Sequence, residues 1–400
     1  MVLLPNHLSA NAFILFGLLL LVGLLAGGLA RRTNFLPSIT GFMIVGFLIG
    51  PGGLGILNET LLSSASFLVD IALALILFDL GRQLEIRPLL TDRGLLYTSF
   101  AEMGGAFVLV GAGLILYGIP VLPALMAAAM GVSGSPAIVV MVIREFRARG
   151  KITTTTLNLL AMNNVGAFLL YTALLPIAFH AQDGSLQDII LSPLYLVFVS
   201  LAVTAVVGLA ALLLVRVLRD QPHVEFAIVI GVLMLAVGMT KAFGGSELLS
   251  AMCCGILVAN IKLLDRLRTA DLGVAAEAFF IILFVIAGAR LHFEAVKIAA
   301  PAAVLFIVLR MLGKCGGIFA LRGMNGLSRG EIVQLGAMLT PMAGLAIGLS
   351  QKTEIIFPAL GLSVIPLMFS AVAILETMGP ALSEWALRRA GEIGKEPLRH

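Results

Sequence analysis

The feature of this sequence that most restricts its fold is a series of long apolar runs joined by short charged connections. Of its 400 residues, 60% are hydrophobic and only 12% are charged. A soluble domain usually carries about 25% charged residues. Runs of roughly 20 apolar residues match a helix that crosses the hydrocarbon core of a bilayer. Because the runs do not alternate in polarity, as membrane-spanning strands do, the sequence predicts an all-α integral membrane protein.

We predict thirteen transmembrane helices in a single membrane domain that covers residues 1–400. Their approximate ranges are 11–30, 36–57, 64–81, 95–117, 120–142, 154–179, 190–215, 224–240, 246–261, 273–289, 298–321, 332–350 and 356–380. The connections between them are short, and residues 386–400 are expected to form a short cytoplasmic tail. No sizeable soluble domain is expected.

Basic residues in the connections predict the orientation of the chain. Of the 26 Lys and Arg residues, 20 fall in connections that follow odd-numbered spans and four fall on the opposite side. Cytoplasmic connections are enriched in Lys and Arg. We therefore expect a multi-pass protein of the cell membrane with its N-terminus outside, its C-terminus in the cytoplasm and an odd number of spans.

Two basic residues, Arg310 and Lys314, lie inside the apolar run 296–320. A cation near the bilayer centre costs at least about 2.5–3.5 kcal/mol, and such residues usually mark an ion or proton pathway with carboxylate or carbonyl partners. The alternative is a purely structural role, in which the two charges neutralise the negative ends of interrupted helices.

Similar segments recur seven spans apart. LILFDLGRQLEI (75–86) resembles ILFVIAGARLHFEAV (282–296), and GVSGSPAIVV (131–140) is matched by GAMLTPMAGLAIG (336–348). Since seven is odd, the two halves must have opposite orientations, and the sequence predicts an inverted repeat of spans 1–6 and 8–13. The predicted units are a first repeat (1–189), a linker helix (190–218) and a second repeat (219–385). Inverted repeats are typical of alternating-access transporters, whose site lies near the bilayer midplane.

Proline interrupts the middle of two spans. Pro136 follows Gly134 and Ser135, and Pro341 follows Thr340. A proline inside a helix removes one backbone hydrogen bond and clashes with the preceding turn. We therefore expect the fifth and twelfth helices to be discontinuous and to cross each other near the midplane.

The interrupted spans, a polar sixth span and a basic eleventh span together resemble the monovalent cation:proton antiporter superfamily, which has the sodium/proton exchanger fold and includes NhaP-type and Kef-type branches. The segments that carry the resemblance are LALILFDLGRQL (73–84), SGSPAIVVMVIREFRARGKIT (133–153), AMNNVGAFLL (161–170) and VLRMLGKCGG (308–317). The resemblance covers nearly the whole chain. It implies transport of monovalent cations and protons without a cofactor, and a homodimer with a panel-like dimerisation domain and a mobile core domain.

Two positions depart from the family pattern. The family's ion-binding Asp would fall at Asn164, and the Thr-Asp-Pro of many members reads Gly134-Ser135-Pro136 here. An amide can ligate a cation through its carbonyl oxygen but has no titratable proton. Proton and cation therefore cannot compete for one carboxylate at Asn164.

Asp79 matches the acidic third-helix position of NhaP-type exchangers, and we predict that it carries the proton and ligates the cation. The alternative is a structural ion pair of Asp79 with Arg310, Lys314 or Arg82. The remaining predicted ligands are Asn163, Asn164, Ser135 and Thr340. The two asparagines lie roughly 15 Å into the sixth span, where they either line the site or bond neighbouring helices.

Glu102 is a candidate proton relay. It lies about 10 Å into the fourth span, next to Gly104 and Gly105, which indicate close helix packing. Two further acidic residues, Glu277 and Glu376, are expected near span ends.

Three functions remain open at this stage: antiport of Na⁺ or K⁺ with H⁺ by an elevator motion, a proton-uncoupled or anion pathway on the same fold, and a non-transporting membrane module. The anion pathway is considered because Arg310 and Lys314 make the site positive. An enzyme is not expected, because the sequence has no HExxH, GxSxG, P-loop or CxxC motif. The three cysteines lack metal-ligand spacing, so no metal site is expected, and the basic residues follow membrane topology rather than a nucleic-acid-binding pattern.

Overall fold

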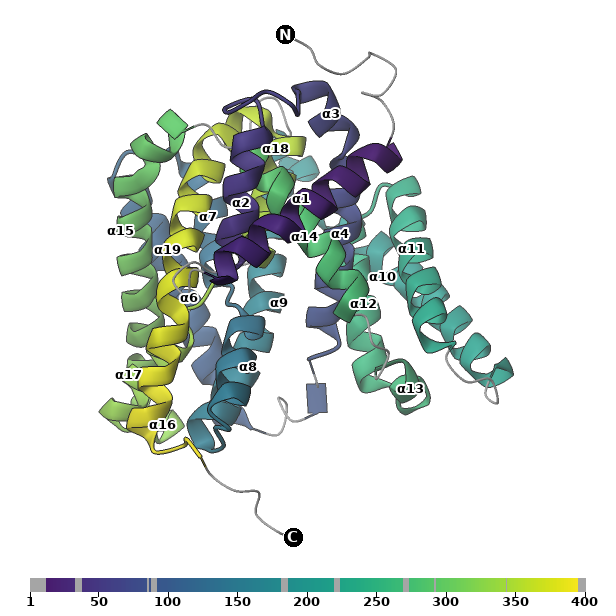
Figure 1. Ribbon diagram of the computed structural model, residues 1–400. Helices are drawn as coiled ribbons and strands as arrows, with labels where there is room; N and C mark the ends of the chain where they lie inside the picture. The colour runs from purple at the N-terminus through teal and green to yellow at the C-terminus, as the bar shows by residue number, and fades with distance from the viewer. Residues whose placement is uncertain are drawn as a thin grey trace.

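The computed structural model describes residues 12–32, 38–84, 86–87, 92–180, 186–218, 224–268, 273–290, 293–342 and 344–394, and this described part is helical without strands (Figure 1). The first half contains α1 (Ala12–Arg32), α2 (Ser38–Ile49), α3 (Glu59–Ser64), α4 (Ser66–Gly81), α6 (Arg93–Leu116), α7 (Val121–Val132), α8 (Pro136–Glu145) and α9 (Lys151–His180). The second half contains α10 (Leu186–Val217), α11 (Glu225–Ala242), α12 (Glu247–Asn260), η1 (Lys262–Leu264), α13 (Asp265–Arg268), α14 (Gly273–Ala289), α15 (Phe293–Ala320), α16 (Arg322–Asn325), α17 (Arg329–Met338), α18 (Gly344–Ile356) and α19 (Pro358–Ala390).

Length and composition identify the helices that can cross a membrane. Eight helical segments of the described residues are long and apolar enough, or nine if α12 and the short helices after it, bent by 97°, form one span. α2 and part of α14 (Ala276–Ala289) are shorter apolar helices. Every predicted span coincides with a helix or with a broken pair of helices, whereas thirteen as the number of membrane crossings stays a prediction.

Two span ends differ most from those expected. α2 ends at Ile49 rather than near 57, because Gly50, Pro51 and the following glycines form turns. α19 continues past 380 to Ala390, where Gly391 ends it in the left-handed conformation at φ 66°. The predicted tail therefore begins inside a helix, and its residues 395–400 lie outside the described part of the chain.

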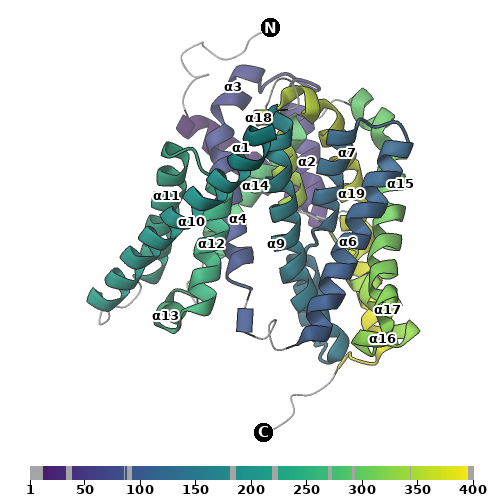
Figure 2. The same cartoon turned by 180° about the vertical axis from the view of Figure 1, so that it is seen from behind.

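The helices form two groups that lie side by side. The core group consists of α6–α9, α15 and α17–α19, and the panel group of α1, α2, α4, α10–α12 and α14. Seen from the front in Figure 1 and from behind in Figure 2, α15 and α17 lie on the opposite side of the molecule from α11 and α13. The groups meet where α9 contacts α10 and α4, and where α18 contacts α4 and α14.

The helix contacts follow the predicted inverted repeat. α2 packs on α14, and the corresponding helices seven spans away, α12 and α4, pack on each other in the same way. α6 packs on α7 as α15 packs on α17, and α7 contacts α9 as α17 contacts α19. α6 and α15 are themselves corresponding helices and lie together. This exchange of partners is what two repeats related by a two-fold axis require.

Glycine allows the closest of these approaches. A Cβ on Gly105 of α6 would overlap the carbonyl oxygen of Gly313 in α15, and a Cβ on Gly313 would overlap that of Gly105. Gly81 of α4 and Gly255 of α12 approach the opposing backbone in the same way. Small residues let membrane helices pack closely. The close packing expected at the neighbouring glycines of α6 is confirmed for Gly105 alone, since Gly104 faces open space.

Ion pairs join the two groups at the end of the molecule where α3 and α18 lie. Lys352 in α18 binds Asp70 of α4 at 2.7 Å and also binds Glu247 of α12. Arg290, directly after α14, binds Glu354 of α18 at 3.0 Å. α18 belongs to the core group and the other partners to the panel group, so these contacts hold the groups together at this end.

Charged contacts at the opposite end include pairs within a single group. Lys151 of α9 binds Glu331 of α17 at 2.7 Å. Glu331 also forms a capping box with Ser328 at the start of α17. The bond from Lys151, together with the Ser328 N–H, lowers the pKa of Glu331 to about 2. This carboxylate therefore connects the first turns of two core helices.

Glu392, just after α19, closes the first turn of α9. Its carboxylate accepts the N–H groups of Ile152 and Thr153 at 2.8 and 2.9 Å and the Thr153 hydroxyl at 2.7 Å. The Glu392 carbonyl accepts the Arg149 N–H at 2.9 Å. The first N–H groups of a helix have no partner inside it, and a negative charge is favourable there. Although Glu392 is distant in sequence, it serves as the N-terminal cap of α9.

Candidate functional site

Two helix interruptions meet inside the core group. α7 ends at Val132, and α8 begins at Pro136 with Ser135 as its N-cap. α17 ends at Met338, and α18 begins at Gly344. The N–H of Ser135 donates to the carbonyl of Pro341 at 2.9 Å, so the two unwound stretches touch. The predicted crossing of discontinuous helices, with Pro136 and Pro341 at the breaks, is confirmed.

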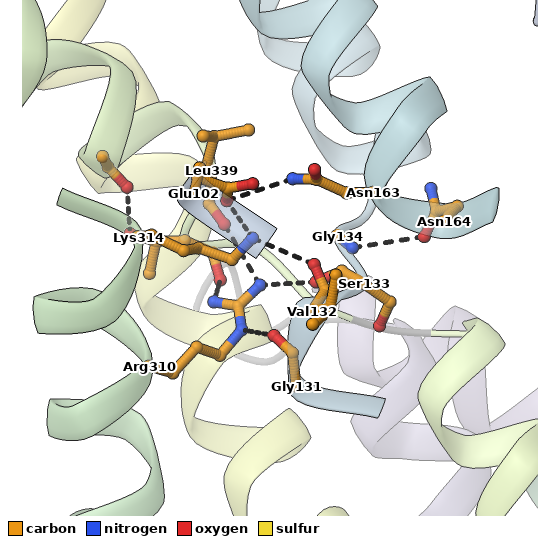
Figure 3. Close-up of polar contacts among 12 residues, drawn as sticks. Glu102, Gly131, Val132, Ser133, Gly134, Asn163, Asn164, Arg310, Lys314 and Leu339 are labelled. Atoms are coloured by element: carbon orange, nitrogen blue, oxygen red, sulfur yellow. Dashed lines mark hydrogen bonds and ion pairs between the residues drawn. The ribbon is translucent and has the colours of Figure 1, made fainter. Parts of the chain in front are cut away.

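Arg310 binds the carbonyl ends of both interrupted helices (Figure 3). Its Nε donates to Gly131 at 2.7 Å and its Nη2 to Ser133 at 2.6 Å, both at the end of α7. Toward the end of α17, its Nη1 donates to Thr340 at 2.8 Å and its Nη2 to Leu339 at 3.1 Å. The C-terminal end of a helix carries partial negative charge and carbonyls without partners. The side chain is fully buried, and the structural role considered for Arg310 matches this geometry.

Lys314, one turn further along α15, forms a buried ion pair with Glu102 of α6. Its Nζ also donates to the carbonyl of Val132 at 2.9 Å. Glu102 Oε1 accepts a second bond from Asn163 Nδ2 of α9 at 3.1 Å. The side chains of Lys314 and Glu102 are 1% and 0% exposed. The fourth, sixth and eleventh predicted spans thus meet at the carbonyl end of α7.

Asn164 binds the backbone of the interruption between α7 and α8. Its Oδ1 accepts the N–H of Gly134 at 3.2 Å, within the unwound stretch between α7 and α8. A Cβ on Gly134 would lie 2.3 Å from Cδ2 of Leu160 in α9, so a larger residue there would require the Leu160 side chain to move. The two neighbouring asparagines therefore have different partners, one a carboxylate and the other the backbone.

The hydroxyl groups of the predicted ligands bond their own helix ends. Ser135 Oγ accepts the N–H of Ile138 at 3.5 Å, and Thr340 Oγ1 donates to the carbonyl of Gly336 at 3.0 Å. Both residues are buried at the crossing, as expected of site residues. Each has a structural role there whether or not it also binds an ion.

Two oxygens of the cluster have no hydrogen-bond partner among the described residues. These are Glu102 Oε2 and Asn163 Oδ1, both buried. Buried acceptors without partners are uncommon and call for an explanation, such as a bound ion or water. The two oxygens belong to side chains that bond each other through their other polar atoms, and carboxylate and amide oxygens are both groups that can ligate a cation.

Asp79 lies outside this cluster. It is on α4 in the panel group, and it binds Arg82 at 2.5 Å and Gln83 at 3.1 Å. Its side chain is 40% exposed. The pair with Arg82 was the structural alternative considered for Asp79, and the structure brings it together with neither Asn163 nor Lys314.

Glu376 lies deeper in its helix than the sequence predicted. It was expected near the end of the last span, but α19 extends to Ala390, so the residue lies well inside the helix and is only 4% exposed. Asp70 of α4 is also largely buried, against Lys352. The burial of these two acids could not be derived from the sequence, because it depends on how separate helices pack against one another.

Two crossed, interrupted helices with buried charges at their meeting point define a secondary transporter of ions. The chain belongs to the sodium/hydrogen exchanger transmembrane family, whose model matches residues 17–378. The family consists of cation and proton transporters that work without a cofactor, and its members are not enzymes. The resemblance drawn from the sequence is thereby confirmed.

Solved structures show the same fold. The sodium/proton antiporter MjNhaP1 from Methanocaldococcus jannaschii at pH 8 has a TM-score of 0.75 and 15% sequence identity, covering 95% of this chain and 98% of that chain. A structure of the same antiporter from an electron-microscopy map has a TM-score of 0.66 and 17% sequence identity, and it covers 95% of this chain and 98% of that chain. Comparison with curated proteins gives no significant match.

Proposed function

We propose that this chain exchanges a monovalent cation, Na⁺ or K⁺, for H⁺, and that the buried Glu102–Lys314 pair couples the two movements. The observation that carries the proposal is that an acid, a base and an amide meet beside the crossed helix ends. Asn164 cannot titrate, and Glu102 supplies a carboxylate at the same place through its bond to Asn163.

The pair can make cation and proton binding exclude one another. A cation at Glu102 Oε2 and Asn163 Oδ1 would compete with the Lys314 ammonium for the same carboxylate. An ammonium group that loses its partner in a dry site is strongly disfavoured. Lys314 would then give up a proton, and it would regain one when the cation leaves. One proton is exchanged for one cation at this pair.

Elevator-type alternating access is supported by where the two groups are joined. The ion pairs of Lys352 and Glu354 hold the core to the panel on the side predicted to be external. Opening toward that side requires these pairs to separate while the core moves relative to the panel. The crossing and its charges all belong to the core group, so they would move together.

The location and assembly follow from the sequence and the family. We place the chain in the cell membrane, N-terminus outside and C-terminus in the cytoplasm, because its basic residues are asymmetric. We also expect a homodimer formed through the panel group.

The anion pathway is not favoured by the contacts at the crossing. Four donor contacts of Arg310 already bind carbonyl oxygens, and Lys314 is neutralised by Glu102. The positive charge that motivated that alternative is therefore compensated within the protein.

Proteoliposomes with a pH-sensitive dye inside test the proposal. Wild type should show proton flux that depends on Na⁺ or K⁺, and Glu102→Gln should abolish it. Asp79→Asn is the matched control and should retain the flux. Absence of cation-dependent flux from about pH 6 to pH 9 would exclude antiport. Loss of flux in Asp79→Asn with normal flux in Glu102→Gln would reassign the coupling residue.

A further inference from the structure

A second buried acid lies beside the crossing, on a helix that the proposed coupling mechanism does not use. Glu376 of α19 is 4% exposed, and its Oε2 has no hydrogen-bond partner in the described part of the chain. α19 packs against α7, α8, α15, α17 and α18, which carry the two interruptions and the basic residues. Glu376 therefore lies among the core helices and not at the lipid surface.

The same face of α19 touches the unwound stretch between α17 and α18. A Cβ on Gly379, three residues after Glu376, would lie 2.9 Å from the ring of Pro341. Pro341 accepts the Ser135 N–H, and so belongs to the contact between the two interruptions. Residues three apart on a helix share a face. Any rearrangement of the crossing would therefore change the surroundings of Glu376.

Further polar atoms lie along this face of α19. Pro380 has no N–H, so the carbonyl of Glu376 lacks its usual helical donor four residues on. Ser383, two turns from Glu376, is fully buried, and its Oγ also has no partner among the described residues. An acid with a carbonyl and a hydroxyl nearby forms a polar strip along a buried helix face.

No basic side chain in the described part forms an ion pair with Glu376. On α15, Arg310 is directed to the carbonyls of the crossing, and Lys314 to Glu102 and a carbonyl. Among the side chains that the structure describes, the other titratable or charged groups on the helices packed against α19 are Arg144 and Glu145 on α8, Lys151 and Tyr171 on α9, Lys297 and Cys315 on α15, Arg329 and Glu331 on α17, and Lys352 and Glu354 on α18. An isolated buried carboxyl avoids the large cost of desolvating its charge by holding a proton.

We propose that Glu376 is a second proton-binding site of this transporter, protonated in the conformation described and deprotonated when the crossing rearranges around a bound cation. The inference rests on the proposed antiport and extends it to its stoichiometry. One proton leaves the Glu102–Lys314 pair and one leaves the carboxyl oxygen of Glu376 for each cation bound, so transport moves net charge.

Proton release on cation binding tests the inference. Purified protein in weakly buffered detergent solution receives Na⁺ or K⁺, a pH dye counts the protons released, and equilibrium dialysis counts the cations bound. Wild type and Glu376→Asp should release two protons per cation, and Glu376→Gln one. Glu384→Gln is the matched control on an exposed turn of α19 and should release two. A ratio of one in wild type, or of two in Glu376→Gln, would overturn the inference.

A spectroscopic measurement covers the case in which Glu376→Gln does not fold. The infrared difference spectrum of wild type with and without cation should show loss of a protonated carboxyl band, which shifts in Glu376→Asp. A spectrum without that band would reject the site. Failure of the antiport itself looks different: wild type would then release no proton at all. A single proton that Glu102→Gln abolishes would keep the antiport and exclude Glu376.

Discussion

The Glu102–Lys314 pair permits a double-mutant test of what holds the crossing together. Both side chains are almost inaccessible, at 0% and 1% exposed, and they lie 212 residues apart in sequence. We would replace Glu102 by Gln and Lys314 by Met, singly and together. Removing one member of a buried ion pair costs about 3–5 kcal/mol, whereas replacing both by neutral residues of similar size is often neutral or stabilising.

Proton transfer to or from the remaining charged group limits how much stability each single variant can lose, and it makes that loss depend on pH. Deprotonating a lysine of ordinary pKa, about 10.4, costs about 4.6 kcal/mol at pH 7, and protonating a glutamate of ordinary pKa, about 4.3, costs about 3.7 kcal/mol. Glu102→Gln should therefore lose at most about 4.6 kcal/mol, and less as the pH rises, because the unpaired Lys314 then loses its proton more easily. Lys314→Met should lose at most about 3.7 kcal/mol, and less as the pH falls.

Thermal unfolding in detergent at about pH 6, 7 and 8.5 measures these differences. Both single variants should melt below wild type, with opposite pH trends, and the double variant should melt close to wild type. Two single losses that simply add in the double variant would show that the groups do not interact. Trends of the same sign would refute the assignment of an unpaired charge to each variant.

Three further perturbations follow from the packing and the ion pairs. Gly105→Ala should destabilise the protein by about 1–3 kcal/mol in the same melting assay, because the new Cβ would overlap the α15 backbone. The control Gly104→Ala, which faces open space, should be neutral or slightly stabilising. Equal effects of the two variants would contradict the close approach of α6 and α15 at Gly105. In a Ser350→Cys variant, an impermeant maleimide applied from outside reports access to this buried position. Adding Lys352→Met should speed the labelling, because the substitution breaks the ion pairs of Lys352 with Asp70 and Glu247 between the core and panel groups. An unchanged rate would mean that these pairs do not restrain separation of the two groups. The pKa of Glu331 is lowered to about 2, so its stabilising effect is complete above an ordinary value near 4.3 and is lost as the pH falls toward 2. Glu331→Gln should cost about 1 kcal/mol at pH 7 and progressively less from about pH 5 to pH 3, and a constant difference would contradict this.

The helix interruptions were readable from the sequence because they are local, and binding of Arg310 to their carbonyls was one of the two roles that the sequence left open. A proline after small residues in an apolar run predicts a broken helix wherever the helix packs. Broken ends expose carbonyls, and a cation at the same depth is their natural partner. Arg310 meets both sets of carbonyls, as that alternative required.

The acid that faces the crossing could not be chosen from the sequence. Depth along a helix follows from residue counting, but rotation about the helix axis follows from packing between helices. Asp79 and Glu102 both lie inside apolar runs, and family likeness favoured Asp79. The close approach of α6 to α15 at Gly105 turns Glu102 toward Lys314, whereas Asp79 binds Arg82 one turn away.

Glu376 was misplaced for a different reason. The predicted last span ends near residue 380, where Pro380 cannot donate a helical hydrogen bond. α19 nevertheless continues through it to Ala390. Membrane helices tolerate such prolines where neighbouring groups compensate, and hydropathy alone does not show that compensation.

The cap that Glu392 places on α9 has a consequence for how the protein is made. The helix that bears both asparagines of the site leaves the ribosome long before its cap, which lies 240 residues downstream of Ile152. Until Glu392 has been synthesised, the first turn of α9 must find water or lipid headgroups for its free amides. A nascent chain that ends just before Glu392 would already contain helices α1 to α19 and would still leave α9 without this cap. Synthesis of Glu392 thus completes a helix that begins at Lys151.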